Sequence, residues 1–321
     1  MYKLTDFKEQ ILITDKSVDC PIKSCNIKVD RQRKDFKRLD NFKCPIHNIY
    51  ISPSTIEYES DLDNLLWIDK QDQALLYQIK TVKRESRISR DNSEDAVTWN
   101  VFRFFERNKS LDDFLSLVSS DFHSSIELIL WSYSQKEQKG WSHLDMARLE
   151  FGENIKRGSE PDIIILTDKT LFFIEAKINA SNKTTPSEPN NLKKYTVGGQ
   201  KWFSKVFKSD YSTIAITDKK YELMRFWLIG TWIAKELNID FHLVNLVLND
   251  KELLIDKEFG KHIICNSHNR FSRLSWESIY NLIKDSNKSN SEADLIIDYY
   301  KTKSAGYDSN GRLKRTFKTI K

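Results

Sequence analysis

The chain lacks any long apolar run. No stretch approaches the roughly 18 consecutive apolar residues of a membrane-spanning helix, and residues 1–16 contain no apolar core of the signal-peptide type. The sequence also contains no internal repeat and no low-complexity tract. These absences predict a globular, cytoplasmic protein that makes no contact with a membrane.

Neither sign of charge is in large excess. The 51 Lys and Arg residues stand against 46 Asp and Glu residues, which gives a net charge of +5. Any affinity for nucleic acid must therefore come from local patches. Aromatic residues are plentiful, with eight Trp, twelve Tyr and eighteen Phe, which argues against disorder. With 321 residues, 39% of them hydrophobic, the chain can bury a sizeable core and form two or three units.

Cysteine is scarce, and the four cysteines are unevenly placed. Cys20, Cys25 and Cys44 lie with His47 inside 28 residues, whereas Cys265 is distant. The first two cysteines form one pair with four residues between them, and Cys44 and His47 form another with two. Such pairs present soft ligands to one tetrahedral ion and predict a structural Cys₃His zinc site. Incidental reduced cysteines are the alternative, because a disulfide is not expected in a cytosolic protein.

The segment between the two ligand pairs is rich in cations, which outnumber its acidic residues. An excess of positive charge on a metal-bound loop predicts contact with phosphates. A solvated, charged loop is the alternative. The candidate nucleic-acid-binding residues are Arg31, Arg33, Lys34, Lys37 and Arg38.

Residues 162–167 and 171–177 are two short apolar segments separated by a polar turn, a pattern that predicts a β-hairpin. A turn centred on Asp168 and Lys169 pairs residues whose numbers sum to 337, so Asp162 lies opposite Glu175. Lys177, two residues beyond Glu175, points to the same face. The turn contains no glycine, so a wider loop is an alternative. Symmetric widening keeps this pairing, whereas a bulge would break it.

These three residues suit metal-dependent hydrolysis of a phosphodiester. Mg²⁺ prefers oxygen ligands and takes one or two carboxylates, which Asp162 and Glu175 can supply. An ammonium such as that of Lys177 can orient or help to deprotonate the attacking water and offset charge on the phosphorus. The alternative is an ordinary charge pair on a solvated sheet. It is disfavoured because both segments are apolar at alternate and intervening positions, as in sheets buried on both faces.

Pro161-Asp162 and Glu175-Ala176-Lys177 resemble the two halves of the motif of the PD-(D/E)XK nuclease superfamily, which has the restriction-endonuclease-like fold. The resemblance covers roughly residues 85–250. It implies an αβββαβ core, with a mixed central sheet and flanking helices, dependence on Mg²⁺ and cleavage of phosphodiester bonds. It also suggests a further catalytic acid on the helix before the sheet. Glu94 is the candidate, with Glu150 and Glu160 as rivals, although Glu94 can equally complement the dipole of its helix.

The chain is expected to divide into a zinc-ribbon-like module over residues 1–60, a nuclease domain over 61–250 and a helical, basic C-terminal extension over 251–321. In the nuclease domain, the first core strand is expected near 147–152 and a later strand over 241–248. Helices are expected over 62–83, 93–107, 110–135, 221–237, 275–284 and 291–300.

The sequence therefore predicts a Mg²⁺-dependent endodeoxyribonuclease acting on double-stranded DNA, with the zinc module helping to hold the substrate. The resemblance implies restriction or another form of defence against foreign DNA, with a second copy of the chain or defence proteins as partners. The alternatives are a nucleic-acid-binding module of the same fold that does not cleave, an RNase and a repair nuclease. Asp162, Glu175 and Lys177 together argue against the binding module, because carboxylates without a metal repel phosphate.

Overall fold

The computed structural model describes residues 1–33, 36–83, 85–187, 192–286 and 291–320. They form two compact units, each assembled from separate stretches of the chain. The first unit comprises Met1–Gln73, Ser86–Arg107 and Tyr280–Lys321, and the second comprises Ala74–Glu85 and Asn108–Ile279. These boundaries differ from the three-part division expected above. Within the described ranges, no helix is long and apolar enough to cross a membrane.

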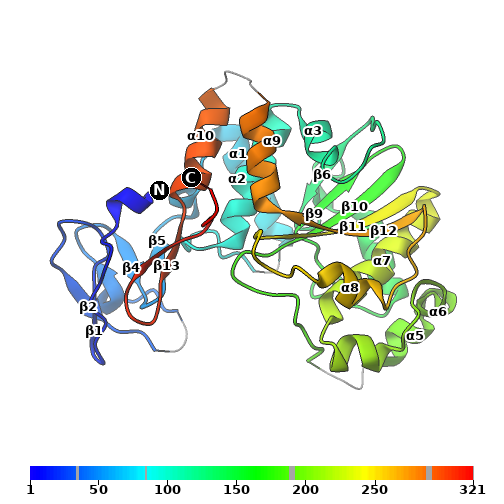
Figure 1. The fold of residues 1–321 in the computed structure, drawn as a ribbon, viewed down its shortest axis with the longest axis horizontal. Helices are drawn as coiled ribbons and strands as arrows, with labels where there is room; N and C mark the ends of the chain where they lie inside the picture. Colours follow the sequence, from blue (N-terminus) through cyan, green and yellow to red (C-terminus); the bar gives the residue numbers. More distant parts are fainter. Residues whose placement is uncertain (34–35, 84, 188–191, 287–290, 321) are drawn as a thin grey trace. The chain divides into compact units, whose positions relative to one another are not determined.

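A mixed sheet is the centre of the second unit (Figure 1). Among the described residues its seven strands have the order β12-β11-β10-β9-β6-β7-β8. Strands β6 (Glu127–Leu130), β9 (Ile163–Leu166) and β10 (Thr170–Ala176) pair antiparallel. Strands β11 (Asp240–Val247) and β12 (Asn269–Ser275) then add in parallel beside β10. The short strands β7 (Tyr133–Ser134) and β8 (Lys139–Gly140) extend the opposite edge.

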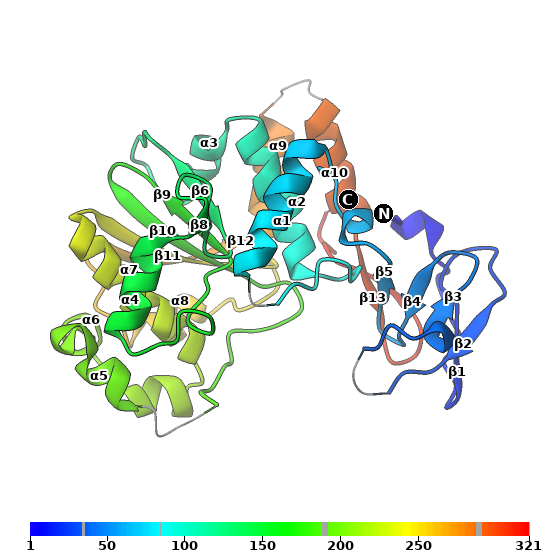
Figure 2. The same cartoon turned by 180° about the vertical axis from the view of Figure 1, so that it is seen from behind.

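Helix α7 (Tyr221–Leu237) covers one face of this sheet, where it packs on β10 and β11. The ring of Trp227 meets that of Phe241 edge to face. Gly230 permits the close approach, since a Cβ at this position would come within 2.1 Å of the Phe241 ring. Helix α4 (Ser142–Glu150) packs beside α7 (Figure 2).

Shorter helical segments complete the second unit. They are α3 (Leu111–Leu115), α5 (Leu192–Lys201), α6 (Phe203–Val206), a π-helical turn (Thr213–Thr217) and α8 (Ile255–Gly260). Two further helices, α1 (Lys70–Val82) and α9 (Trp276–Asp285), contribute residues to both units.

The first unit is built from small sheets and two longer helices, α2 (Glu94–Arg107) and α10 (Ser291–Thr302). Its small core includes Phe7, Val18, Ile51, Tyr58 and Tyr307. The strands are the hairpin β1 (Ser17–Asp19) and β2 (Lys28–Asp30), the three-stranded sheet β3 (Lys43–Cys44), β4 (Ile49–Ile51) and β5 (Ile56–Tyr58), and the hairpin β13 (Ser304–Tyr307) and β14 (Leu313–Arg315). Single 3₁₀ turns occupy Leu4–Asp6, Asp40–Phe42 and Asp61–Asn64.

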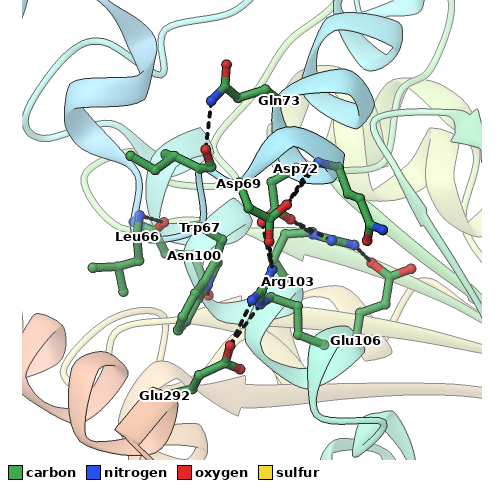
Figure 3. A network of polar contacts seen from close by, with 12 residues as sticks. Leu66, Trp67, Asp69, Asp72, Gln73, Asn100, Arg103, Glu106 and Glu292 are labelled. Carbon is green, nitrogen blue, oxygen red and sulfur yellow. Dashed lines mark hydrogen bonds and ion pairs between the residues drawn. The ribbon is translucent and has the colours of Figure 1, made fainter.

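A polar network joins the first turn of α1 to α2 and α10 within the first unit (Figure 3). Arg103 on α2 donates from Nε and Nη2 to Oδ1 of Asp72, at 2.9 and 2.6 Å. The other oxygen of Asp72 accepts from Arg107 at 2.8 Å. Arg107 also donates to Glu292 on α10, at 2.9 Å. The side chain of Asp72 is fully buried, so this carboxylate depends on the two guanidinium groups.

Several expected elements are confirmed. Helices α2, α7, α9 and α10 and strand β11 lie where the sequence predicts them. The helix expected over 62–83 is shorter, and comprises only α1. Two expectations are wrong: residues 147–150 end helix α4 and do not form the first core strand, and most of 110–135 is not helical, since β6 lies within it.

Candidate functional site

Asp162, Glu175 and Lys177 lie together where β9 begins and β10 ends. The ladder between these strands pairs Ile163 with Ile174 and continues to Leu166 with Leu171. The paired numbers sum to 337, so the predicted register is confirmed. Asp162 lies one residue before this ladder, opposite Glu175. Its Oδ2 accepts a hydrogen bond from the backbone N–H of Ala176, at 2.9 Å.

Glu175 is the buried centre of this group. It is only 2% exposed, and its Oε1 pairs with the ammonium of Lys177. Its Oε2 is buried and has no hydrogen-bond partner in the part of the chain that the structure describes. Burial and the negative charge of Asp162 raise the pKa of Glu175 well above its usual value, against the attraction of Lys177. A buried carboxylate oxygen without a donor is unfavourable, and a bound cation would satisfy it.

A third carboxylate, Glu222, belongs to the group and was missed from the sequence. It lies in the first turn of α7, and its Oε2 is 3.2 Å from Nζ of Lys177. Burial opposes the charge of Lys177, but Glu175, Asp162 and Glu222 raise its pKa above the usual value, so the ammonium stays protonated. Three carboxylates thus surround one cation. The one feature of the sequence that points to Glu222 is its place as an acidic residue at the start of the apolar helix that follows the hairpin.

The segment after β10 positions the start of α7. The hydroxyl of Thr184 accepts the backbone N–H of Glu222 at 2.9 Å. Two residues earlier, the fully buried amide of Asn182 donates to Oδ1 of Asn245 at 2.7 Å. Asn245 is the neighbour of Glu175 in the ladder between β10 and β11. These contacts tie Glu222 to the same end of the sheet as Glu175.

A cavity of about 230 Å³ opens beside Glu222. Lys156 and Arg157 line it and are exposed, and Arg225 lines it from α7. Nε of Arg225 donates to Glu153 at 2.9 Å. Burial opposes ionisation of Glu153, but Arg225 together with hydrogen bonds from Ser159 and Tyr195 lowers the pKa of that carboxyl. The exposed cations of this cavity can therefore meet an anionic ligand next to the carboxylate group.

The three candidates for a further catalytic acid have different surroundings. Glu160 lines the cavity just described. Glu150, at the end of α4, accepts the backbone N–H of Gly199 at 3.0 Å. Glu94 is the first residue of α2 and belongs to the first unit, whereas Asp162, Glu175, Lys177 and Glu222 all belong to the second. Besides Glu175, Glu222 of the second unit is a carboxylate that contacts Lys177.

Cys20, Cys25, Cys44 and His47 come together as the sequence predicts. In the described part of the chain they are the one group of three or more such side chains suited to a metal, and their ligand atoms all lie within 4.8 Å of one another. The sulfurs of Cys25 and Cys44 are 3.8 Å apart, and Nδ1 of His47 is 3.7 Å from Cys20 and 3.5 Å from Cys44. Tetrahedral zinc has edges of about 3.8 Å between sulfurs and about 3.6 Å between sulfur and nitrogen, given its usual bond lengths. The cluster could therefore hold a metal ion such as zinc.

Two short hairpins present these ligands. Cys20 follows β1 and Cys25 precedes β2, while Cys44 ends β3 and His47 precedes β4. The N–H of Asn48 donates to the carbonyl of Cys44 at 2.9 Å and closes the second turn. The three cysteines are buried and His47 is half-buried. The ligands are thus assembled by backbone turns next to the small core of the first unit.

The candidate nucleic-acid-binding residues differ in what they contact. Arg38 donates to the backbone carbonyls of Tyr58 and Glu59, at 3.2 and 3.1 Å, so its guanidinium holds the loop against β5. Arg31 and Arg33 both lie near Asp15. Lys37 is exposed, and Lys34 lies outside the described residues.

Comparisons with known proteins yielded no match: no family model matches the chain, and neither a curated protein nor a solved structure matches it.

Proposed function

We propose that the protein is a metal-dependent nuclease whose catalytic group is Asp162, Glu175 and Lys177, with Glu222 positioning the lysine. The observation that carries the proposal is the buried Oε2 of Glu175, which has no hydrogen-bond partner among the described residues. It lies among three carboxylates that face a single ammonium. A divalent cation would satisfy that oxygen and offset the remaining negative charge.

The order of the elements supports a restriction-endonuclease-like core. Strands β6, β9 and β10 pair antiparallel, helix α7 follows, and β11 then pairs in parallel with β10. This is the arrangement that the βββαβ part of the PD-(D/E)XK resemblance implies. The motif residues flank the β9–β10 ladder, at the end nearest the first turn of α7.

The residues suggest distinct roles. Asp162 and Glu175 would hold Mg²⁺, which when bound supplies Lewis-acid activation of the scissile phosphate and of a water. Lys177 has a raised pKa, which favours it as a hydrogen-bond donor to a water or phosphate oxygen and not as a base. Glu222 fixes the direction of the ammonium. Lys156 and Arg157 would contact phosphates beside the scissile one.

The resemblance makes double-stranded DNA the first substrate to test and defence against foreign DNA the setting. We also propose that the Cys₃His cluster holds structural zinc. All four ligands come from the protein, so no coordination position remains open for water, as is usual in structural zinc sites.

The test is incubation of the protein with supercoiled plasmid, single-stranded DNA and RNA, with and without Mg²⁺. We expect cleavage of DNA only with the metal. Asp162→Asn and Glu175→Gln should each lower the rate by at least about 100-fold, the usual cost of losing one preorganised electrostatic contact. Lys177→Met should act similarly. Glu222→Gln should lower the rate less, about tenfold, because Glu222 acts through Lys177.

The matched control is Glu150→Gln. It neutralises a carboxylate of the same unit that contacts the backbone of Gly199, and it should cleave at the wild-type rate. Circular dichroism should show that all variants are folded. The proposal is wrong if the wild-type protein cleaves no nucleic acid with Mg²⁺ or Mn²⁺, or if Asp162→Asn and Glu175→Gln cleave as fast as Glu150→Gln.

A further inference from the structure

The first unit contains a cavity of about 630 Å³ that the proposed catalytic group does not use. Sites for small ligands usually enclose roughly 300–1,000 Å³. The wall combines three guanidinium groups with one aromatic ring and several hydroxyl and amide groups. Its lining residues include Arg31, Arg33, Phe36, Ser54 and Arg90.

The cavity has positive charge in excess. Among the described residues that line it, Asp15 is the one carboxylate, and it lies 3.6 Å from Arg31 and 3.7 Å from Arg33. The side chain of Asp15 is 90% exposed, and such exposed, loose ion pairs contribute little. A phosphate could displace Asp15 from Arg31 and Arg33 with little loss of free energy. It could also accept two parallel hydrogen bonds from one guanidinium group.

Arg31 also carries a donor without a partner. Its Nη1 donates to the carbonyl of Thr14 at 3.1 Å, which fixes the side chain. Its Nε is buried and has no hydrogen-bond partner within the described ranges. Buried N–H groups in folded proteins are nearly always satisfied, so this donor is suited to an acceptor oxygen of a ligand.

Phe36 and Arg90 lie together in the lining of the cavity. The guanidinium carbon of Arg90 lies 5.2 Å from the centroid of the Phe36 ring. Nε of Arg90 is 3.4 Å from Oε2 of Glu57, whose other oxygen binds Arg38. Arg90 is therefore held in place. Aromatic rings and guanidinium planes are the surfaces on which unstacked bases pack.

We propose that this cavity binds a nucleoside monophosphate unit, with the phosphate on Arg31 and Arg33 and the base against Phe36 beside Arg90. The unit can be a free nucleotide or one unpaired nucleotide of a strand. The hydroxyl of Ser54 can hydrogen-bond the sugar or base. The inference goes beyond the proposed nuclease activity, because it requires binding alone and concerns the first unit.

The experiment measures binding of the full chain carrying Glu175→Gln, without added Mg²⁺ and without chelator, so that neither cleavage nor metal loss interferes. The probes are the four deoxynucleoside monophosphates, the four ribonucleoside monophosphates, inorganic phosphate, a single-stranded oligonucleotide and a duplex. We expect a mononucleotide or the single strand to bind more tightly than inorganic phosphate. If the single strand binds more tightly than the mononucleotides, the ligand is one unpaired nucleotide of a strand. If the two bind equally, the ligand is a free nucleotide.

Two variants test the assigned contacts. Arg31→Gln with Arg33→Gln should weaken nucleotide binding at least about tenfold, because two charged donors are lost. Phe36→Leu should weaken it about tenfold, in line with the usual effect of losing base stacking, yet leave inorganic phosphate binding unchanged.

The matched control is Lys23→Gln with Lys28→Gln, which removes two charges from exposed positions outside the cavity. The metal content of each variant checks that the Cys₃His module is folded. The inference is overturned if no mononucleotide or single strand binds, or if the two arginine changes weaken binding no more than the two lysine changes. Neither result depends on cleavage, so failure of the nuclease proposal and failure of this one are distinguishable.

Discussion

At the scale of single residues, His242 shows how burial controls charge. It lies on β11 and is 2% exposed. Its Nε2 is 2.8 Å from the hydroxyl of Ser272, and its Nδ1 is buried without a partner. Burial, and after it the positive charge of Arg270, lowers the pKa of His242 to about 4. The imidazole is therefore neutral in the folded protein near neutral pH.

We expect His242 to make the protein less stable in mild acid. The unfolded residue binds a proton near pH 6.5 and the folded one near pH 4. In this window the unfolded state holds more protons, so the free energy of unfolding falls as the pH falls. The loss should approach roughly 3 kcal/mol. Urea unfolding between pH 7 and 4 should show a shallower pH dependence for His242→Gln than for the wild type, and equal slopes would contradict the assignment.

The catalytic group was partly predictable at this scale. The pairing of Asp162 with Glu175 follows from a short hairpin and the strict alternation of side chains along a strand. The position of Glu222 at the start of an apolar helix is visible in the sequence, but its contact with Lys177 is not, because it depends on how α7 lies across the sheet. Glu94 has the helical position that the resemblance suggests, yet it is part of the other unit. Local patterns do not encode such tertiary relations.

At the scale of elements, the hairpins that carry the cysteine ligands are very short. Strands β1 and β2 have three residues each and β3 has two. Isolated hairpins of this kind are at best marginally stable. The free energy of binding a structural metal is then largely free energy of folding. We therefore expect the module to depend on its metal.

Purified protein should contain about one zinc ion per chain. Cys44→Ser should lose the metal and increase hydrogen exchange over residues 1–60, while residues 108–279 keep their protection. Cys265→Ser is the matched control, because Cys265 is an exposed cysteine outside the cluster. A protein that is folded but free of zinc after purification without chelator would refute the prediction.

The network of Figure 3 makes a second prediction for elements. Arg103→Met should lower the free energy of unfolding by about 3 kcal/mol, because the buried carboxylate of Asp72 keeps only Arg107 as a partner. Denaturant unfolding measures the change. Adding Asp72→Asn to Arg103→Met should cost less than the sum of the two single changes, because the second change removes the uncompensated charge. Additive effects would show that the pair is not coupled.

Elements with a complete helical pattern and the apolar hairpin of β9 and β10 were predicted well, whereas residues 147–151, β6 and β12 were not. Ala147, Leu149 and Phe151 alternate like a strand. The buried apolar residues are Leu144, Ala147 and Phe151, at helical spacing, and Leu149 is 62% exposed. Strand β12 escaped prediction because it is mostly polar, being at the edge of the sheet, where pairing with β11 stabilises it. The four-residue run of β6 does not distinguish strand from helix.

At the scale of the whole molecule, the chain returns to the first unit near its end. Residues 280–321 belong to that unit together with residues 1–73 and 86–107. Tyr307 is part of the same small core as the cysteines, and its N–H donates to the carbonyl of Ser54 at 2.9 Å. The closing segment, expected to be a basic extension, thus also contributes to the core. Composition does not reveal contacts between residues so distant in sequence.

Lys303 should be the main electrostatic contact between the C-terminal segment, residues 280–321, and the rest of the first unit. It is 2% exposed, and its Nζ donates to Asn64 at 2.8 Å and lies 3.4 Å from Asp91. Lys303→Met should destabilise the first unit by about 3 kcal/mol, because the buried carboxylate of Asp91 would lose its ion-pair partner. Hydrogen exchange should quicken over residues 1–73 and 86–107 and stay unchanged over 108–279.

A control separates the charge from the packing of the lysine stem. Asp91→Asn with Lys303→Met removes both charges, and it should recover part of the lost protection, because an amide can still accept the hydrogen bond that Tyr58 donates to Asp91. If Lys303→Met leaves exchange unchanged, the ion pair of Lys303 with Asp91 does not hold the C-terminal segment in the first unit. If the double variant is no better protected from hydrogen exchange than Lys303→Met, the aliphatic part of the Lys303 side chain and not its charge stabilises the first unit.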